Sequence, residues 1–349
     1  MVRKSYVEKL DGLMRASKHV HRAKFLVASL AVAALSASAC ASDNAASGNA
    51  APDDVRLGYQ TNIWGMPVYA AVQEGYFKTA GVPLKEIQVD SGNRVRDLMV
   101  ARQADVGTFA GPTLNVGMDK SDIVAVGMVA NTGRTVGIVA RKGAGIKGLA
   151  DLRGKKIAIQ AGSSIGDVAV QKVLPSVGLH EGDYQLVNIP VNNMVAAMAQ
   201  GAIDAMVNVE PYNAIATSQG LGERVVDFGK FDKLPLFIGM RQGFIDDHHD
   251  QAVAILSALL KSSKTWQTDP QAAYKVISDF YTKTGFKVDL SQVTDAASRL
   301  DVTTTYTDGV KSYLTDIAKA QKQAGLIAEI PDYSKTINTS LLQEAAAKR

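Results

Sequence analysis

Short apolar runs alternate with longer amphipathic stretches over much of this chain. The runs are rich in Val, Ile and Ala, and the segments between them place apolar residues every three or four positions. This alternation is typical of β-α-β units, in which helices cover a largely parallel sheet. In the first part of the chain we therefore predict strands at residues 55–59, 87–89, 105–108 and 123–129.

A second set of the same units follows a polar crossing at residues 132–135. Strands are predicted there at residues 136–140, 157–159, 185–189, 205–207 and 224–226. A return crossing at residues 234–241 then leads into amphipathic helices. The pattern predicts an α/β protein with two lobes, two hinge crossings and a cleft between them. Its parts are lobe 1 (residues 55–133 and 237–349) and lobe 2 (residues 134–236).

Residues 149–164 contain the pattern that best predicts a binding site. The unbroken apolar run at residues 157–159 suits a strand buried on both faces, and Gly154 can end the short turn before it. Ser163 or Ser164 can then cap a helix predicted at residues 165–177. Backbone N–H groups, two hydroxyls and the positive helix end would meet at this sheet edge, which suits an anion. Simple helix capping by the serines explains the pattern equally well.

The first 40 residues differ from the rest. A basic leader precedes an apolar run at residues 25–35, which is too short for a stable membrane span, and small residues follow. This order predicts a signal peptide at residues 1–39. The single cysteine, Cys40, stands where bacterial lipoproteins are lipidated, although Ala37 replaces the usual Leu. We favour lipidation over plain cleavage beside an uninvolved cysteine, with residues 40–54 as a flexible tether.

Removing the leader also removes the apparent basicity of the chain. The formal net charge of the whole sequence is +4, but residues 1–40 carry seven of its 38 basic and two of its 34 acidic residues. The remainder has 31 basic and 32 acidic residues, so no basic excess remains to attract nucleic acid. We predict no nucleic-acid partner.

Sequence signals for catalysis and metal binding are weak. After the leader, the histidines are His180, His248 and His249, and no phosphate loop of the Gly-x-x-x-x-Gly-Lys type is present. Adjacent histidines point in different directions on a helix, so residues 246–250 favour helix-capping charge over a metal site. We predict a protein that is not an enzyme and has neither a metal nor a cofactor.

Five segments resemble, in the right order, the substrate-binding proteins of ABC importers in the nitrate/sulfonate/taurine group, which includes binders of pyrimidine thiamine precursors. They are residues 64–82, 103–107, 151–164, 200–205 and 210–212. The resemblance implies a type II periplasmic-binding-protein (Venus-flytrap) fold that closes on a small sulfonate, nitrate or pyrimidine-like ligand. It implies an exported monomer, in the periplasm or lipid-anchored at the cell surface, that delivers the ligand to a membrane permease with a cytoplasmic ATPase. A ligand-sensing subunit of an extracytoplasmic receptor system is the alternative.

Candidate ligand-binding residues follow from the strand ends, because ligands of open α/β sheets bind outside the carboxyl ends of the strands. They are Gln60, Asn62, Trp64, Ser91, Gly111, Thr113, Arg134, Ser163, Ser164, Asn192 and Glu210. Thr113 and Ser163 begin helices in opposite lobes, so two positive helix ends could face one anionic group. In family members that bind sulfonates, these positions resemble the anion contacts.

Three candidates have specific alternatives. Trp64 is predicted to stack against the ligand, the alternative being an aromatic side chain on the lobe surface. Arg134 could pair with an anionic ligand or fix the hinge. Glu210 could meet a cationic or N–H-bearing part of the ligand, or form a salt bridge between the closed lobes.

Overall fold

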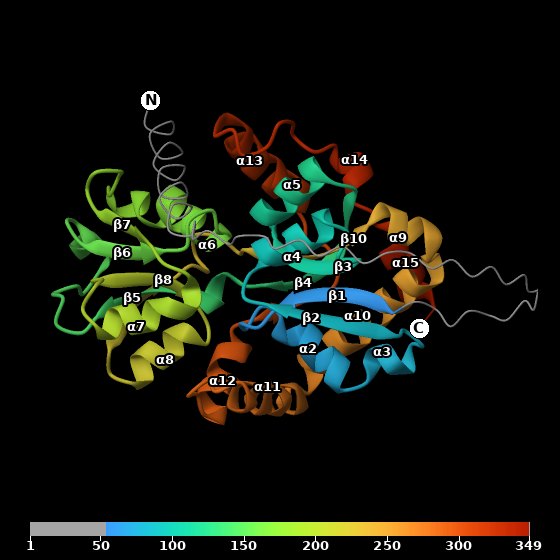
Figure 1. The fold of residues 1–349 in the computed structure, drawn as a ribbon, viewed down its shortest axis with the longest axis horizontal. Coiled ribbons are helices and arrows are strands. Elements are labelled where there is room, and N and C mark those ends of the chain that lie inside the picture. Colours follow the sequence, from blue (N-terminus) through green and yellow to red (C-terminus); the bar gives the residue numbers. More distant parts are fainter. Residues whose placement is uncertain (1–53, 349) are drawn as a thin grey trace, which may run out of the picture.

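The computed structural model describes residues 54–348, so the predicted signal peptide and Cys40 lie outside the described residues. The described chain folds around two β-sheets, which lie side by side in Figure 1 with helices packed around each. The α/β class predicted from the apolar runs is confirmed.

The first sheet has six strands in the order β11-β4-β10-β3-β1-β2. β1 pairs in parallel with β2 and β3, so the carboxyl ends of these three strands meet at one sheet edge. β10 runs antiparallel to β3 and β4, because it returns from the second sheet. The strands are β1 (Val55–Gln60), β2 (Leu84–Val89), β3 (Val106–Ala110), β4 (Ile123–Asn131), β10 (Pro235–Arg241) and β11 (Asp301–Val302).

The second sheet has five strands in the order β7-β6-β8-β5-β9. β6 is parallel to β7 and β8, whereas β5 is antiparallel to β8 and β9. Both sheets are therefore mixed, because the strands next to the crossings run against their neighbours. The strands are β5 (Val136–Arg141), β6 (Lys156–Ile159), β7 (Gln185–Asn188), β8 (Ala205–Val209) and β9 (Gly222–Asp227).

Helices bury the centres of both sheets. Every residue of β3, β4 and β8 is buried, as expected for strands that are covered on both faces. The helices before the return crossing are α2 (Met66–Gln73), α3 (Tyr76–Thr79), α4 (Gly92–Val100), α5 (Gly111–Lys120), α6 (Ser164–Val168), α7 (Met194–Ala199) and α8 (Tyr212–Ser218). The later ones are α9 (Gln242–Asp247), α10 (His249–Thr268), α11 (Gln271–Lys283), α12 (Leu290–Ser298), α13 (Val310–Gln323), α14 (Tyr333–Thr336) and α15 (Ser340–Ala347).

The helix predicted at residues 165–177 is present, but only its first part, α6, is regular α-helix. α6 is followed by a π-helical turn at Ala169–Val173 and a 3₁₀ turn at Pro175–Val177. Pro175 has no backbone N–H to donate, and its ring clashes with the carbonyl one turn earlier, so a continuous α-helix cannot pass through it. The short turn before β6 is confirmed at Leu149–Leu152, and Gly154 has the predicted left-handed conformation with φ of +74°.

The two crossings bond to each other. The backbone N–H of Gly133 donates to the carbonyl of Lys233 over 2.8 Å, and that of Phe228 donates to the carbonyl of Gly133 over 3.2 Å. A Cβ at Gly133 would lie 2.0 Å from the carbonyl oxygen of Asp232, so only glycine allows this approach. The hinge between the sheets is thus a pair of hydrogen-bonded segments.

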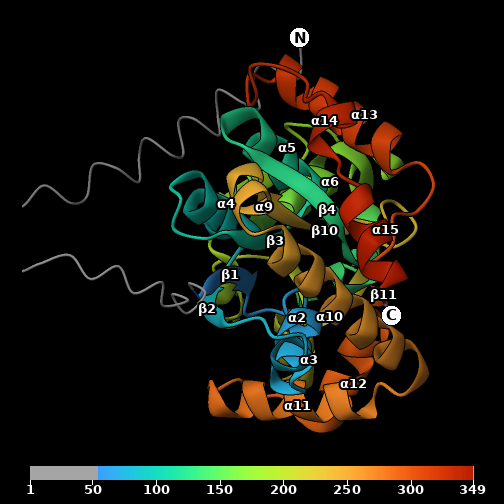
Figure 2. The same ribbon diagram turned by 90° about the vertical axis from the view of Figure 1, so that its right-hand side faces the viewer.

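Helices after the return crossing pack almost entirely on the first sheet. The long α10 contacts α2, α3 and α15 (Figure 2). Asp246 and Asp247 lie at the end of α9, whereas Asp250 lies in the first turn of α10, so the predicted capping charge applies to Asp250 alone. Within residues 54–348, no cluster of three or more His, Cys, Asp or Glu side chains is arranged to hold a metal ion.

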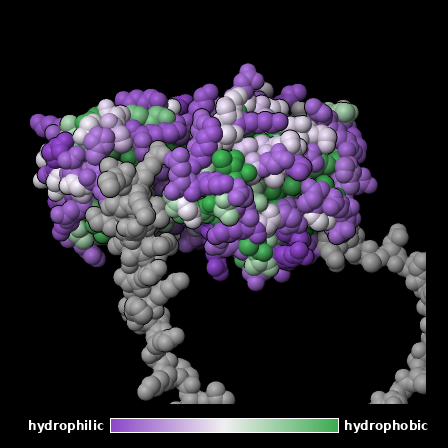
Figure 3. All heavy atoms as spheres, turned by 90° about the horizontal axis from the view of Figure 1, so that it is seen from above, coloured by the Kyte–Doolittle hydropathy of each residue, from purple (hydrophilic) through white to green (hydrophobic). Residues whose placement is uncertain are grey.

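Polar residues cover most of the face seen in Figure 3, and the hydrophobic patches on it are small. Large hydrophobic side chains that are exposed in the described chain are Val177, Leu290, Leu326 and Ile330. No helix between residues 54 and 348 combines the length and apolarity needed to cross a bilayer.

Candidate functional site

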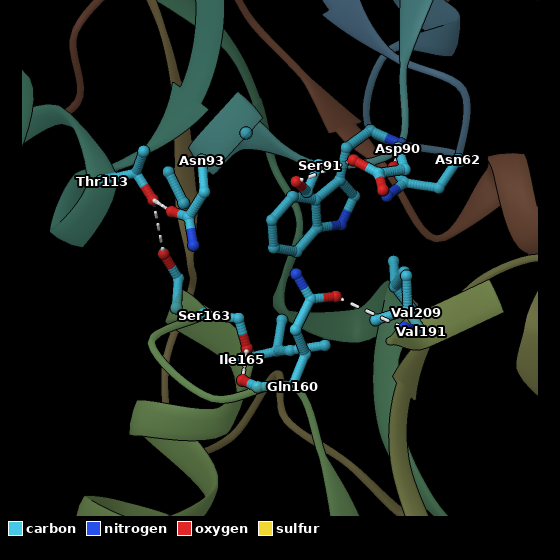
Figure 4. A pocket seen from close by; sticks show the side chains of 14 residues that line it. Asn62, Asp90, Ser91, Asn93, Thr113, Gln160, Ser163, Ile165, Val191 and Val209 are labelled. Carbon is cyan, nitrogen blue, oxygen red and sulfur yellow. Dashed lines mark hydrogen bonds between the residues drawn. The ribbon is translucent and has the colours of Figure 1, made fainter. Parts of the chain in front are cut away.

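A cavity of about 50 Å³ lies where the carboxyl ends of β1, β2 and β3 face those of β6, β7 and β8 (Figure 4). Both sheets supply its walls, which is the position predicted for a ligand site. Its lining residues are Asn62, Trp64, Asp90, Ser91, Gly92, Asn93, Ala110, Thr113, Gln160, Ser163, Ser164, Ile165, Val191 and Val209.

The loop after β1 holds Trp64 in the cavity wall. The Asn62 Oδ1 atom accepts the backbone N–H of Trp64 over 3.0 Å, and the indole Nε1 donates to the Thr135 hydroxyl over 2.9 Å. A Cβ at Gly65 would lie 1.8 Å from the carbonyl oxygen of Gln60, so the tight loop requires glycine there. The indole is 7% exposed and is anchored to a crossing segment, which fixes the aromatic surface offered to a ligand.

The ends of β2 and β3 supply hydroxyl and amide groups. Ser91 caps α4 by accepting the backbone N–H of Arg94 over 3.4 Å. The hydroxyl of Thr113, in the first turn of α5, donates to Asn93 Oδ1 over 3.0 Å. No side chain caps α5, which begins with Gly111 followed by Pro112. The positive end of α5 therefore faces the cavity without a side-chain acceptor.

The end of β6 supplies the opposite wall. The Ser163 hydroxyl donates to the carbonyl of Gln160 over 2.7 Å and accepts the backbone N–H of Gly166 over 3.2 Å, so the predicted capping of the next helix is confirmed. Gln160 points into the same space in Figure 4 and accepts the backbone N–H of Val191 over 3.3 Å.

Two hydrogen bonds join the walls across the cavity. Asn93 Nδ2 donates to the carbonyl of Gly162 over 2.9 Å, and the hydroxyls of Thr113 and Ser164 lie 3.4 Å apart. Each bond links an element of the first sheet to one of the second. The structure is thus a closed arrangement in which the two walls touch.

The charges around the cavity are uneven. Asp90 is the only ionisable residue in the lining formed by the described chain, which contains neither Lys nor Arg nor His. Burial, together with the nearby negative charge of Asp90, raises the pKa of the Tyr212 phenol to about 12. An anionic group in this cavity would therefore be held by hydroxyls, amides and helix ends, and it would be repelled near Asp90.

The structure brings together six of the predicted residues and leaves five outside the lining. Those that line the cavity are Asn62, Trp64, Ser91, Thr113, Ser163 and Ser164; those outside are Gln60, Gly111, Arg134, Asn192 and Glu210. Arg134 and Asn192 are exposed at the surface. A Cβ on Gly111 would lie 2.9 Å from the Tyr313 ring, so this residue packs on α13.

Gln60 and Glu210 are fully buried and already paired. The Gln60 amide donates to the carbonyl of Thr108 over 2.7 Å and accepts the Thr108 hydroxyl over 2.8 Å, so it supports the cavity floor from below. The Glu210 carboxylate forms an ion pair with Arg224 of β9 and accepts the backbone N–H of Ala214 over 2.9 Å. This pair lies within one lobe, so the predicted salt bridge between lobes is not formed in this structure.

Sequence reasoning missed three polar lining residues, namely Asp90, Asn93 and Gln160. The signal was available, because Asp90 and Gln160 directly follow predicted strands, Asn93 lies in the loop after one of them, and the same rule selected Ser91 and Ser163. The remaining missed residues are glycine or apolar, and nothing in their residue types distinguishes them from core positions.

A larger cavity of about 460 Å³ lies elsewhere on the first sheet, beside Arg56, Asp105 and Arg241. It sits at the amino ends of β1 and β3, where open α/β sheets do not place ligands. Its central charges already satisfy one another, since Arg56 and Arg241 each pair with Asp105 over 2.7 Å. The smaller cavity between the sheets is therefore the stronger candidate.

Comparisons with known proteins agree with this architecture. A family model described as NMT1/THI5 like matches residues 62–273, more than half of the chain. A Bacillus subtilis protein named for binding aliphatic sulfonates is 26% identical over 62% of this chain and 66% of its own length. The 4-amino-5-hydroxymethyl-2-methylpyrimidine phosphate synthase of Schizosaccharomyces pombe is 23% identical over 67% of this chain and 71% of its own.

The fold is that of periplasmic binding proteins. The alkanesulfonate-binding protein SsuA from Xanthomonas axonopodis pv. citri, solved with MOPS bound, superposes with a TM-score of 0.72 at 18% identity. The match covers 83% of this chain and 99% of that one. The expected periplasmic-binding-protein fold is confirmed.

Proposed function

Because the chain belongs to the NMT1/THI5-like family, we propose that it is the extracytoplasmic solute-binding component of an ABC importer. The observation that carries this proposal is the cavity between the facing sheet edges, to which both walls contribute polar side chains. The lobes of this binder are residues 55–133 with 237–349, and residues 134–236. Relatives named for sulfonate binding support the same class.

The ligand is a small sulfonate-, nitrate- or pyrimidine-like molecule with an anionic or strongly hydrogen-bond-accepting end. This end lies between Thr113 and the Ser163/Ser164 turn. The uncapped start of α5 and the hydroxyls on both sides of the contact support this placement. Hydrogen bonds to a charged group contribute about 1.5–3 kcal/mol each, so a few such contacts hold a small anion without a basic residue.

Both lobes must contact the ligand, since a ligand shifts a protein toward closure only by binding the closed state more tightly. The bonds between Asn93 and Gly162 and between Thr113 and Ser164 support a closed state in which the ligand is enclosed. Opening breaks these two bonds and leaves the hydrogen-bonded crossings as the hinge.

The family also contains a synthase, so an enzymatic function is the second candidate. The cavity favours binding over catalysis. Among the lining residues of the described chain, Asp90 is the only ionisable group, and the Ser163 hydroxyl is engaged by two backbone groups. A nucleophile and a base at hydrogen-bonding distance are what covalent catalysis requires.

Delivery requires partners at a membrane. We propose that residues 1–39 direct export, that Cys40 becomes the lipid-modified first residue, and that the monomer delivers its ligand to a permease with a cytoplasmic ATPase. Mass spectrometry of the membrane fraction should detect a diacylglycerol adduct on Cys40, and Cys40→Ala should release the protein. A mature form that retains Ala39 would contradict the anchor.

The binding proposal is tested by a thermal-shift screen of the purified chain against nitrate, ethanesulfonate, taurine and hydroxymethylpyrimidine, followed by calorimetry. Thr113→Val should weaken the best ligand about tenfold, because one hydrogen bond to a charged group is lost. Thr282→Val, on the exposed face of α11, is the matched control and should change nothing. Absence of any ligand-induced shift would refute the proposed function.

A further inference from the structure

The single carboxylate of the cavity has no cationic partner. Asp90 directly follows β2, and its side chain is exposed to the space between the lobes. It accepts the neighbouring Ser91 hydroxyl over 3.0 Å and forms no ion pair with any residue from 54 to 348. By contrast, the carboxylates of Asp105 and Glu210 each form an ion pair with arginine.

Asp90 lies at the opposite end of the cavity from the hydroxyls of Thr113 and Ser163. Figure 4 shows Asp90 and Asn62 on one side, Thr113, Asn93 and Ser163 on the other, and Gln160 between them. The cavity is therefore polarised, with a negative end at Asp90 and a donor-rich end at the helix starts. A ligand that fills it lengthwise meets two different electrostatic environments.

Helix capping does not account for this carboxylate. The hydroxyl of Ser91 caps α4, and Asp90 lies one residue before the cap. A charge there gains only a small interaction with the helix dipole. In this closed arrangement Asp90 remains exposed, so its negative charge lies beside the cavity without a protein counterion among the described residues.

We propose that Asp90 determines specificity by binding a protonated amine, so that the ligand is a short zwitterion. Its anionic group lies at the Thr113 and Ser163 end, and its ammonium donates to the Asp90 carboxylate. This inference rests on the proposed function, since it assigns the second end of the same ligand. Trp64 lines the same cavity and offers an aromatic face to the cation.

The role first expected of Glu210 thereby passes to Asp90. Glu210 has its cation in Arg224, whereas the carboxylate after β2 does not. A charge-assisted hydrogen bond is about twice as strong as a neutral one, so the amine adds both affinity and direction. The ligand can bind productively in only one orientation.

The test compares matched ligands by calorimetry on the full-length mature chain. The probes are taurine and 3-aminopropanesulfonate, each against the alkanesulfonate of the same length without the amine. Wild type should bind at least one of the two aminosulfonates tenfold or more tightly than the alkanesulfonate of the same length. Asp90→Asn should abolish most of this preference while leaving the affinity for the plain alkanesulfonate unchanged or improved, because a repulsive charge has been removed.

Two further variants separate specificity from structure. Asp97→Asn, on the exposed part of α4 where Asp97 pairs with Arg96, is the matched control and should keep the preference. Asp90→Glu retains the negative charge and should keep part of the preference for the amine-bearing ligand. Equal loss of both ligand classes in Asp90→Asn, or a wild-type preference for the plain alkanesulfonate, would overturn the inference while leaving the proposed function intact. If no probe binds to wild type, both fail.

Discussion

Two carboxylates follow strands of opposite sheets at the two sheet edges that meet, yet their surroundings differ. Glu210 follows β8, is fully buried and is held by Arg224 and a backbone N–H. Asp90 follows β2, is exposed, and has only the hydroxyl of its neighbour as a partner. The first is satisfied by the protein, whereas the second is available to a ligand. Position at a strand end therefore predicts nearness to the site but not the role of a charge.

The largest expected effect comes from breaking the satisfied pair. Glu210→Gln removes the charge and leaves the Arg224 guanidinium largely enclosed without its counterion. The free energy of unfolding should fall by about 3 kcal/mol, since breaking a buried ion pair leaves one charge uncompensated. Urea unfolding measures this loss. Glu223→Gln, on the exposed part of β9, is the control, and equal stability of the two variants would contradict the assignment.

A third carboxylate extends the comparison to the amino-terminal edge of the first sheet. Burial alone would raise the pKa of Asp105, but hydrogen bonds from Arg56 and Arg241 lower it to about 2. Because the folded-state pKa lies below the unfolded value of about 3.9, this stabilisation is present above that value and is lost as the pH falls toward 2.

Asp105→Asn should therefore lower the free energy of unfolding at pH 7 by about 2–3 kcal/mol. The difference between variant and wild type should shrink as the pH falls from about 4 to 2, because wild type then loses the same charge. Unfolding in urea at several pH values measures both effects. A gap that stays constant over this interval would show that packing, and not the ion pairs, accounts for the loss.

The sequence predicted most of the scaffold for reasons that can be named. The apolar runs located the strands whose carboxyl ends surround the cavity, and the Gly154 position followed from a backbone constraint that acts within a few residues. Six cavity residues followed from the strand-end rule. These predictions depended on local chemistry alone.

What the sequence did not reveal depends on partners far along the chain. Arg224 lies 14 positions beyond Glu210, and only the pairing of β5 with both β8 and β9 brings the two side chains together. The same holds for Gly111, because α13, about 200 residues later in the chain, packs against it and separates it from the cavity lining. The position of Asp90 was predictable from the strand-end rule, but only the fold shows that no described residue forms an ion pair with it.

The donor-rich end of the cavity should show an intermediate effect. Ser164→Ala should weaken the binding of an identified ligand by about 1–2 kcal/mol, roughly one hydrogen bond to a charged group, because the Ser164 hydroxyl lies in the lining beside Thr113, while backbone N–H groups retain the rest. Calorimetry measures this change. Ser298→Ala, on exposed α12, is the control. A loss of binding free energy of about 3 kcal/mol or more would mean that the serine hydroxyl alone, and not the backbone N–H groups, binds the anionic group.

The smallest expected effect is on the stability of the unliganded Asp90→Asn variant. Asp90 is exposed and does not cap α4, so removing its charge costs only part of the helix-dipole interaction, about 0.3–0.5 kcal/mol. Saturating ligand should widen this gap, because a bound ligand stabilises the folded state in proportion to the logarithm of its affinity, about 1.4 kcal/mol for each tenfold difference. Thermal or urea unfolding with and without a zwitterionic ligand measures both values. If the unliganded variant loses as much stability as Glu210→Gln, Asp90 is a structural carboxylate and the contrast between the two strand ends disappears.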